Sequence, residues 1–315
     1  ATTNTSANPD NNIEGIPLTE ARGLYGGDND ADNSGTFRYV SIRHGGQDIG
    51  AGNEINGLTM GAVGSGTTID HVEVIYNQDD AFEWFGGTVN TSHLVAAYCG
   101  DDGFDYDQGF RGQHQFWYCV QEPGVSGNGG EHDGGTDPET AAPFSMPIVY
   151  NATYVSDPSL TTTLINMRDN AGGKYFNSVF AGFADGLQVE NLSDGEDSWA
   201  RYNANEIEYV SNAWQNIGNL ALVYTGEDEN EDLIADTAST STLTTYLADN
   251  NVAEASGFIA AWSATGYDPR PLGAAASAGM SVRPEHDQIE AVDYHGAFAP
   301  GETTWISGWT LISEQ

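Results

Sequence analysis

Positive charge is the scarcest property of this sequence. Among 315 residues, lysine and arginine number 9 against 46 aspartates and glutamates, for a formal net charge of −37. A chain this negative repels phosphates and gains nothing from counterion release, which excludes nucleic acid as a partner; anionic lipid surfaces are excluded on similar grounds. Two interpretations of the negative charge are compatible with each other. The surface could be that of a secreted or salt-adapted protein, and divalent cations could neutralise much of the charge while the protein functions.

Cysteine and long apolar runs are also scarce. Cys99 and Cys119 are too few for a disulfide framework. No stretch approaches about 18 consecutive apolar residues, so we expect no membrane insertion. The chain starts at Ala1 without a basic and apolar leader, so a signal peptide would lie outside this sequence. From charge and architecture we expect an exported protein, either extracellular or on the cell surface.

What the sequence does contain is a repeat with a period of 22 residues. Segments 71–84 and 93–106 align His with His, Tyr with Tyr, Asp-Asp with Asp-Asp and Phe with Phe. A period near 22 in strand-like sequence is typical of one coil of a β-solenoid. Strand alternation then predicts that Phe82 and Phe104 point inward and that Glu83 and Asp105 point outward, on strands about 4.8 Å apart.

These copies, with a weaker third one at 176–190, resemble the right-handed parallel β-helix proteins of the pectate-lyase-like superfamily. Stretches 22–28 (RGLYGGD) and 292–298 (VDYHGAF), the latter followed by 305–309 (WISGW), are also similar to a group of exported bacterial β-helix proteins without an assigned activity. The resemblance implies an all-β fold, a right-handed parallel β-helix. It also implies that the acidic turn Gly100–Asp105 is comparable with acidic turns of β-helix glycosidases and lyases.

The chain divides into three parts on composition. Residues 1–35 are polar and are expected to form an N-terminal arm. Strand-like segments from 36 to 225 predict the β-helix, with a Gly-rich loop insertion at 122–145. Residues 226–315, with helical spacing at 242–255, are expected to form a C-terminal cap, because an open solenoid end exposes unpaired backbone.

Acidic residues in three places could bind calcium. Asp28, Asp30 and Asp32 occupy alternate positions of a Gly-containing loop, as the first ligands of an EF-hand do, although Asn33 stands where that loop has glycine. Asp228, Asn230 and Asp232 repeat the pattern less well. The third place is a stripe formed by the stacked turns. Its members are Asp79, Asp80, Glu83, Asp101, Asp102, Asp105 and Asp107.

For each place the alternative is a solvated acidic turn without metal. Carboxylates about 5 Å apart repel by roughly 3 kcal/mol at an effective dielectric constant near 20, and by less than about 1 kcal/mol in open water. A stripe exposed to water therefore needs no cation, whereas a shielded one does. Ca²⁺ is the cofactor that these oxygen ligands predict.

The same stripe could instead be catalytic. Paired carboxylates on adjacent strands could act as acid and base on a glycosidic bond, with Asp102 and Asp105 as candidates. A calcium-assisted lyase would need a base, for which Arg111 and His114 lie nearby in sequence. Trp117 is expected on the outward side, either under the 122–145 loop or exposed as a sugar-stacking platform, so Trp117 and His114 are candidate ligand contacts.

Two functions therefore remain open. The first is a calcium-stabilised surface protein that presents a β-face to a glycan or to a neighbouring subunit, with self-association as a variant of the latter. The second is a polysaccharide hydrolase or lyase that uses the acidic stripe.

Overall fold

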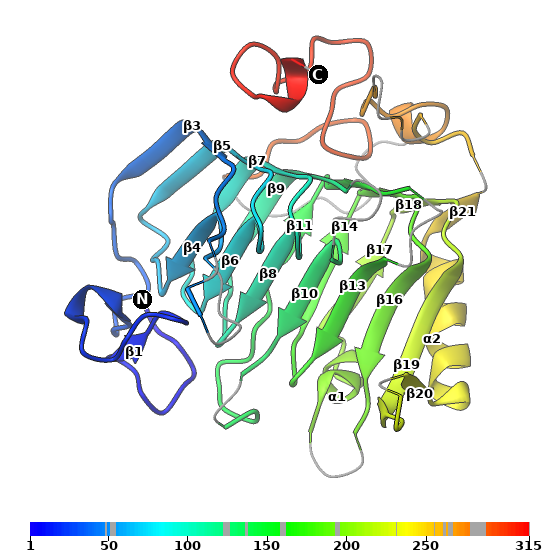
Figure 1. Ribbon diagram of the computed structural model, residues 1–315. Helices are drawn as coiled ribbons and strands as arrows, with labels where there is room; N and C mark the ends of the chain where they lie inside the picture. Colours follow the sequence, from blue (N-terminus) through cyan, green and yellow to red (C-terminus); the bar gives the residue numbers. More distant parts are fainter. Residues whose placement is uncertain are drawn as a thin grey trace.

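The computed structural model describes residues 1–315 except 48, 51–54, 122–126, 136–137, 158–161, 193–195, 231, 255, 261–262, 264–266, 278–287 and 315. Within the described residues the chain coils into a parallel β-helix (Figure 1) with two long sheets and little helix. The expected all-β solenoid is therefore confirmed. Among the described residues, no helix is both long and apolar enough to cross a membrane.

The first sheet has eight strands, which are parallel except for the last pair. They are β4 (Leu58–Gly61), β6 (Phe82–Phe85), β8 (Phe104–Asp107), β10 (Gly130–Asp133), β13 (Thr163–Arg168), β16 (Asp185–Glu190), β19 (Asn219–Glu227) and β20 (Leu233–Ala235). Strand β10 lies inside the predicted 122–145 insertion. The interpretation of that whole segment as a loop is therefore wrong at its centre, because β10 is a regular member of the sheet.

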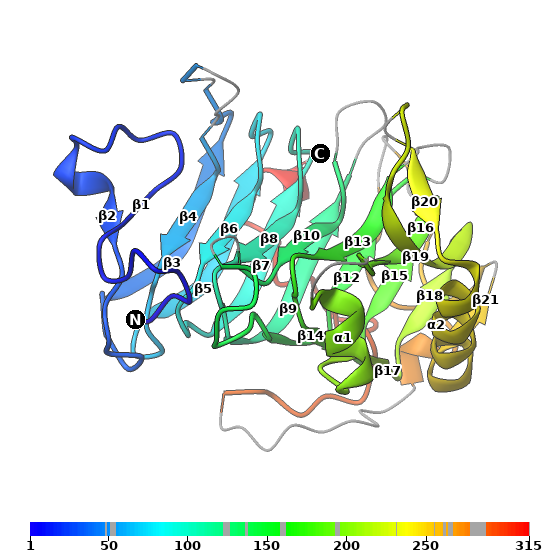
Figure 2. The same cartoon turned by 90° about the horizontal axis from the view of Figure 1, so that it is seen from below.

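The second sheet has eleven strands and covers the other sides of the coils. They are β3 (Thr36–Arg43), β5 (Thr68–Ile75), β7 (Thr91–Ala97), β9 (Gln113–Val120), β11 (Ile148–Tyr150), β12 (Thr153–Val155), β14 (Gly173–Phe176), β15 (Val179–Ala181), β17 (Ile207–Val210), β18 (Ala213–Gln215) and β21 (Val252–Glu254). Viewed from below (Figure 2), the two sheets enclose the interior along the length of the coil.

One residue of each coil adopts a left-handed backbone at the same place in this second sheet. These residues are Tyr39, His71, His93, Phe116, Asn151, Asn177 and Ser211, with φ between 52° and 60°. The strand pairing steps over them: Asp70 pairs with Ser92 and Val72 with Leu94. The sheet bends here, and from β11 onward each strand is divided in two. Asparagine tolerates this conformation, whereas aromatic residues adopt it at some cost.

Aromatic rings fill the interior between the sheets. Phe82 and Phe104 pair on β6 and β8, and so do Trp84 and Tyr106, as the repeat predicts. All four are fully buried. The 22-residue register is therefore confirmed for this part of the coil.

The next coil is one residue longer. Thr91 on β7 pairs with His114 on β9, a step of 23 residues, whereas Phe85 still pairs with Asp107 after 22. The extra residue lies in the turn between Asp107 and His114. It reverses the faces of β9, so that Trp117 and Cys119 point inward where a constant period would place Phe116 and Tyr118.

The two ends of the chain pack against the coil. The arm holds the short antiparallel pair β1 (Asn11–Asn12) and β2 (Leu24–Tyr25) and the 3₁₀ turn η1 (Ala21–Gly23). The amino group of Ala1 donates to the carbonyl oxygen of Ala62 at 2.6 Å. Helix α1 (Ser198–Asn203) precedes β17, and α2 (Thr237–Asn250) packs mainly against β19, beside the last coil (Figure 1).

Residues 288–314, which we call the C-terminal strap, lie elsewhere. They include the 3₁₀ turn η3 (Ile312–Glu314), while η2 (Ala275–Ser277) precedes them. The strap runs back over the outer face of β5, β7 and β9 (Figure 1) and buries Ile75, Val95 and Tyr118 against Phe298 and Ile306. The segment expected to form one cap therefore has two roles: α2 covers an end, and the strap covers a side.

Candidate functional site

The stacked acidic turns form one wall of a pocket of about 420 Å³ on the outer side of the eight-stranded sheet. The pairs Asp79-Asp80 and Asp101-Asp102 come from the turns that lead into β6 and β8. Outward positions of successive strands supply the remaining acids of the sheet. The described residues that line it are Glu14, Asn56, Asp79, Asp80, Glu83, Asp101, Asp102, Asp105 and Glu131.

The strand register brings these carboxylates together. Glu83 on β6 pairs with Asp105 on β8, and one oxygen of each lies within 4.8 Å of an oxygen of Asp80. Asp79, Asp80 and Asp101 form a second group that meets the same limit. The predicted stripe is therefore present as a geometric cluster, apart from Asp107.

Hydrogen bonds hold most of the carboxylates in place. Asp80 accepts from the backbone amide of Asp102 at 2.9 Å. Asp102 accepts from the amide of Asn128, and Glu83 accepts from the side-chain amide of Asn56. Asp105 differs, because its buried Oδ1 has no hydrogen-bond partner in the part of the chain that the structure describes. A buried carboxylate oxygen without a partner is costly unless a proton or a cation satisfies it.

Burial and mutual repulsion strongly perturb the site. Burial, and then the Asp101 carboxylate, raises the pKa of Asp102 to about 7. Burial, and then the charge of Asp102, raises the pKa of Glu131 to about 8. The pKa values of Asp80, Glu83 and Asp105 rise well above the ordinary range, again mainly through burial and then through neighbouring carboxylates. Near neutral pH the pocket therefore favours protons or cations.

The main counter-charge at this face is Arg168 on β13. Its guanidinium lies 2.5 Å from Glu131 and 2.7 Å from Asp133 on the neighbouring strand β10. Sequence reasoning missed Glu131 and Asp133 because it predicts a loop for 122–145, and it missed Arg168 because the carboxylates that this residue pairs with are those two. The alternation of Glu131 and Asp133 around His132, which is fully buried, was the signal for a half-buried strand.

Other predicted calcium ligands lie outside the pocket. Asp107 points outward in the next column and accepts from the amide of Gln108. Asp30 binds the amide and hydroxyl of Thr2 and lies 2.9 Å from the guanidinium of Arg111. Asp28 is exposed, and Asp32 accepts from the hydroxyl of Ser34 at 3.1 Å. Among the described residues, Asp28, Asp30 and Asp32 do not meet in a three-ligand group.

The second loop pattern is likewise an exposed turn. Asp228 accepts from the backbone amides of Asn230 at 2.8 Å and of Asp232 at 3.2 Å. These bonds are those of a self-contained Asx turn. The described residues of this loop join no three-ligand group either.

Three further candidates do not line the pocket. Trp117 is fully buried, donates to Thr91 and stacks on Phe104 at 4.4 Å, so the expectation that it points outward is wrong; the extra residue before β9 is the reason. His114 is also fully buried, between Trp117 and Trp84. Neither ring can contact a glycan in this conformation. Arg111 is paired with Asp30 and is absent from the pocket lining.

Comparison with known proteins agrees with this architecture. Residues 2–266 match the family model described as a pectate-lyase-like β-helix domain. No curated protein and no solved structure matches the chain at a significant level. Because the match covers most of the sequence, the chain belongs to the family of pectate-lyase-like β-helix domains.

Proposed function

We propose that the acidic pocket binds Ca²⁺ and that the bound ion stabilises the β-helix as a binding or structural module outside the cell. The observation that carries this proposal is the Oδ1 atom of Asp105. It is buried, it has no hydrogen-bond partner among the described residues, and it belongs to a carboxylate surrounded by other carboxylates.

The chemistry of the lining fits a hard cation. Of the nine described residues that line the pocket, eight are acidic and the ninth is an asparagine, with no thiol or imidazole among these nine. Ca²⁺ accepts six to eight oxygen ligands in irregular geometry, whereas Mg²⁺ needs a near-ideal octahedron. Carboxylates from turns and strands of several coils form an irregular set of oxygen ligands more readily than a regular octahedron, which favours Ca²⁺ over Mg²⁺. Asp80, Glu83 and Asp105 are the residues that would hold the ion.

Function outside the cell follows from the ion that is available there. Calcium sites of extracellular modules work at about 10⁻⁴–10⁻³ M, and a net charge of −37 suits a soluble exported protein. The partner in this proposal is a glycan or a neighbouring subunit that meets the outer face of the parallel sheet. The polar column Asp105, Glu131, Asn166 and Gln188 supplies hydrogen-bonding groups along that face.

Calorimetric titration with Ca²⁺ tests the cation site. The wild type should bind at least one ion, and the double variant Glu83→Gln plus Asp105→Asn should lose that binding. Asp228→Asn is the matched control, because it removes an exposed carboxylate elsewhere. Identical isotherms for the wild type and the double variant would remove the proposal.

A second candidate function is glycoside hydrolysis, favoured by the pKa of Asp102 at about 7. A carboxyl group that keeps its proton near neutral pH can act as a general acid beside a more exposed carboxylate such as Asp101. Lyase chemistry has less support, since Arg111 is held by Asp30 and Arg168 is engaged by two carboxylates. Reducing-sugar release from neutral and acidic glycans, abolished in Asp102→Asn, would favour the hydrolase; glycan binding without turnover would favour the module.

A further inference from the structure

A ladder of aromatic rings runs over the outer face of the second sheet, whereas the acidic pocket lies on the first. The rings of this ladder belong to the residues with a left-handed backbone in four successive coils, which are Tyr39, His71, His93 and Phe116. Successive ring centroids are 4.6, 4.2 and 4.9 Å apart. The two imidazoles in its centre are nearly parallel, with an interplanar angle of 15°.

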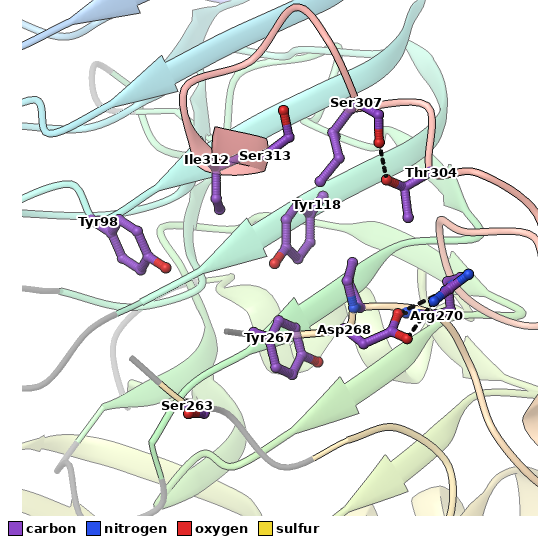
Figure 3. A pocket seen from close by; sticks show the side chains of 12 residues that line it. Tyr98, Tyr118, Ser263, Tyr267, Asp268, Arg270, Thr304, Ser307, Ile312 and Ser313 are labelled. Carbon is purple, nitrogen blue, oxygen red and sulfur yellow. Dashed lines mark hydrogen bonds and ion pairs between the residues drawn. The ribbon is translucent and has the colours of Figure 1, made fainter. Parts of the chain in front are cut away.

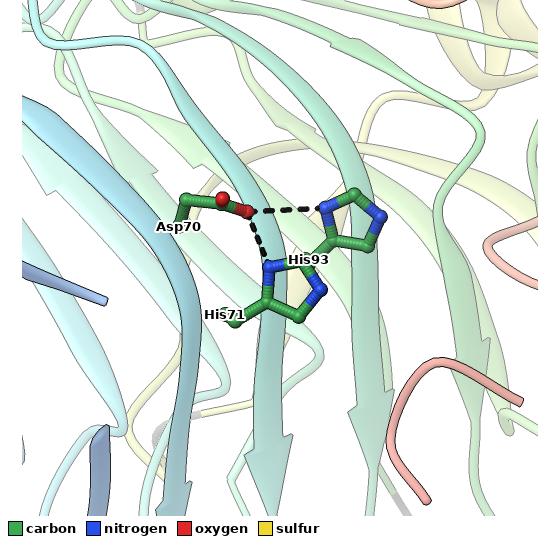
Figure 4. A group of neighbouring side chains, drawn as sticks. All are labelled: Asp70, His71 and His93. Carbon is green, nitrogen blue, oxygen red and sulfur yellow. Dashed lines mark hydrogen bonds and ion pairs between the residues drawn. The ribbon is translucent and has the colours of Figure 1, made fainter. Parts of the chain in front are cut away.

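Both imidazoles share one carboxylate (Figure 4). Oδ1 of Asp70 lies 2.7 Å from Nδ1 of His71 and 3.2 Å from Nδ1 of His93. The hydroxyl of Ser92 donates to the same oxygen at 2.9 Å, and Arg38 lies 2.6 Å from the other oxygen. Asp70 is therefore already balanced by one full positive charge.

This group is better suited to hydrogen bonding than to a metal ion. An imidazole ligand holds a cation in the plane of its ring, along the nitrogen lone pair. Two nearly parallel rings 4.2 Å apart have no shared plane in which one ion could lie. The Nδ1–H groups of two neutral imidazoles can instead both donate to Asp70.

The C-terminal strap closes over the ladder. The ring of Trp305 lies edge-on, 5.0 Å from His93 and 5.9 Å from His71, and Trp309 lies 5.8 Å from His71. Beyond the tryptophans, Glu73 of β5 accepts from the amides of Leu311 at 2.9 Å and Ile312 at 3.0 Å.

At its other end the strap is held through Glu290. The backbone amide of Glu290 donates to Gln115 of β9 at 2.8 Å, and the Gln115 side chain donates back to the Glu290 carbonyl. The charged groups that surround the histidine pair are thus Arg38 from β3, Asp70 from β5 and Glu290 from the strap. Arg43 and Glu73 form a further, more distant pair at 3.9 Å.

We propose that the stacked pair His71–His93 is a proton-sensitive latch, which keeps the C-terminal strap docked at neutral pH and loosens it in mild acid. The device needs no ligand. It depends only on two stacked imidazoles that share one already neutralised carboxylate beneath two tryptophan rings.

The direction of the effect follows from charge and burial. Protonation of both rings would place two positive charges about 4 Å apart, with one carboxylate between them and Arg38 already bound to it. Burial is the main cause that lowers the pKa of His93, and the neighbouring His71 lowers it further, against the opposing effect of Asp70. Since an undocked His93 would titrate near its ordinary pKa of about 6.5, protons favour the undocked state as the pH falls below that value.

Loosening of the strap would uncover two features. One is the apolar outer face that contains Ile75, Val95 and Tyr118. The other is the coil side of a pocket of about 470 Å³, which is lined by Thr304 and Ser307 of the strap and by Tyr98 and Tyr118 of the coil (Figure 3). The latch would therefore control access to a surface that is closed at neutral pH.

Hydrogen exchange of the Leu311 and Ile312 amides tests the latch, because both are protected only while the strap is docked. After correction for the intrinsic pH dependence of exchange, wild-type protection should fall severalfold between about pH 7.5 and about pH 5.5, because the lowered pKa of docked His93 means that protons favour the undocked strap. His93→Phe keeps a stacked ring without a titratable nitrogen, and its protection should not change over this range.

His44→Gln is the matched control, since His44 is exposed and stacks on Tyr76 rather than beneath the strap tryptophans. It should retain the wild-type response. Wild-type protection that stays constant with pH would overturn the proposal, and so would an undiminished response in both His93→Phe and His71→Gln. All samples contain the same concentration of Ca²⁺, and the acidic pocket is unchanged in every variant, so its titration contributes equally to all of them and the difference between wild type and variant isolates the histidines.

Discussion

The ring of Phe104 lies against that of Phe82, with centroids 5.4 Å apart and planes within 13° of each other. The two residues are 22 positions apart in the chain and directly paired between β6 and β8. Trp117 and Tyr154 continue the stack from the other sheet. Phe104 is thus a point where several coils and both sheets meet.

Substitution of Phe104 should therefore be costly. Phe104→Ala removes a fully buried ring and leaves a cavity between rigid strands, so we expect a loss of about 3–5 kcal/mol in the free energy of unfolding. Guanidinium denaturation measures it. Leu18→Ala is the control, since Leu18 is 84% exposed and should change stability by less than about 0.5 kcal/mol.

The acidic pocket should make stability depend on pH in the absence of divalent cations. Carboxyl groups whose folded pKa lies above the unfolded one destabilise the protein once they ionise. With chelator present, the melting temperature should therefore fall as the pH rises from about 4 toward the values near 7 and 8 of Asp102 and Glu131, then level off. Saturating Ca²⁺ should restore most of the loss at neutral pH. If the chelated protein had the same melting temperature at about pH 4 and at about pH 8, this expectation would be contradicted.

Arg168 should have opposite effects on stability and on ion affinity. Its guanidinium neutralises Glu131 and Asp133, so Arg168→Gln should lower the melting temperature of the chelated protein. The same change removes a positive charge that repels Ca²⁺. If this repulsion is about 1 kcal/mol, the variant should bind Ca²⁺ roughly fivefold more tightly. Calorimetry on the variant checks the affinity, and unchanged or weaker binding would count against the assignment of the pocket. Arg22→Gln, whose side chain is exposed in the arm, is the control.

The left-handed column gives a prediction about backbone strain. Asn177 has a φ of 53° and is fully buried. Asn177→Gly and Asn177→Val both remove the amide side chain, but only valine carries a branched Cβ into this conformation. We expect valine to be less stable than glycine by about 1–2 kcal/mol. Equal denaturation midpoints would show that the column is not strained.

The sequence predicted the solenoid because identical residue types 22 positions apart fall on the same column, as Phe82 and Phe104 do. The sequence did not predict the position of Trp117. One extra residue in the turn after Asp107 leaves the alternation within β9 intact, but it exchanges the residues that point inward with those that point outward. The contribution of Glu131 was missed for a different reason: the glycines on both sides of β10 indicate a loop, and they outweighed the short alternation of Glu131 and Asp133 around His132. The position of the strap depends on contacts such as Glu73 with Leu311, which join residues more than 200 positions apart.

The coil-by-coil recurrence of the left-handed bend makes the length of the molecule adjustable in discrete steps. A deletion of 22 residues from Phe82 through Gly103 would set Phe104 on the rung now held by Phe82, with Leu58 as its new neighbour, and would leave every later bend in place. Whole-coil additions and removals thus preserve the geometry at both joins, whereas the loss of a single residue within a strand would reverse the faces of the residues that follow it in that strand. The natural unit of variation in this architecture is the complete turn.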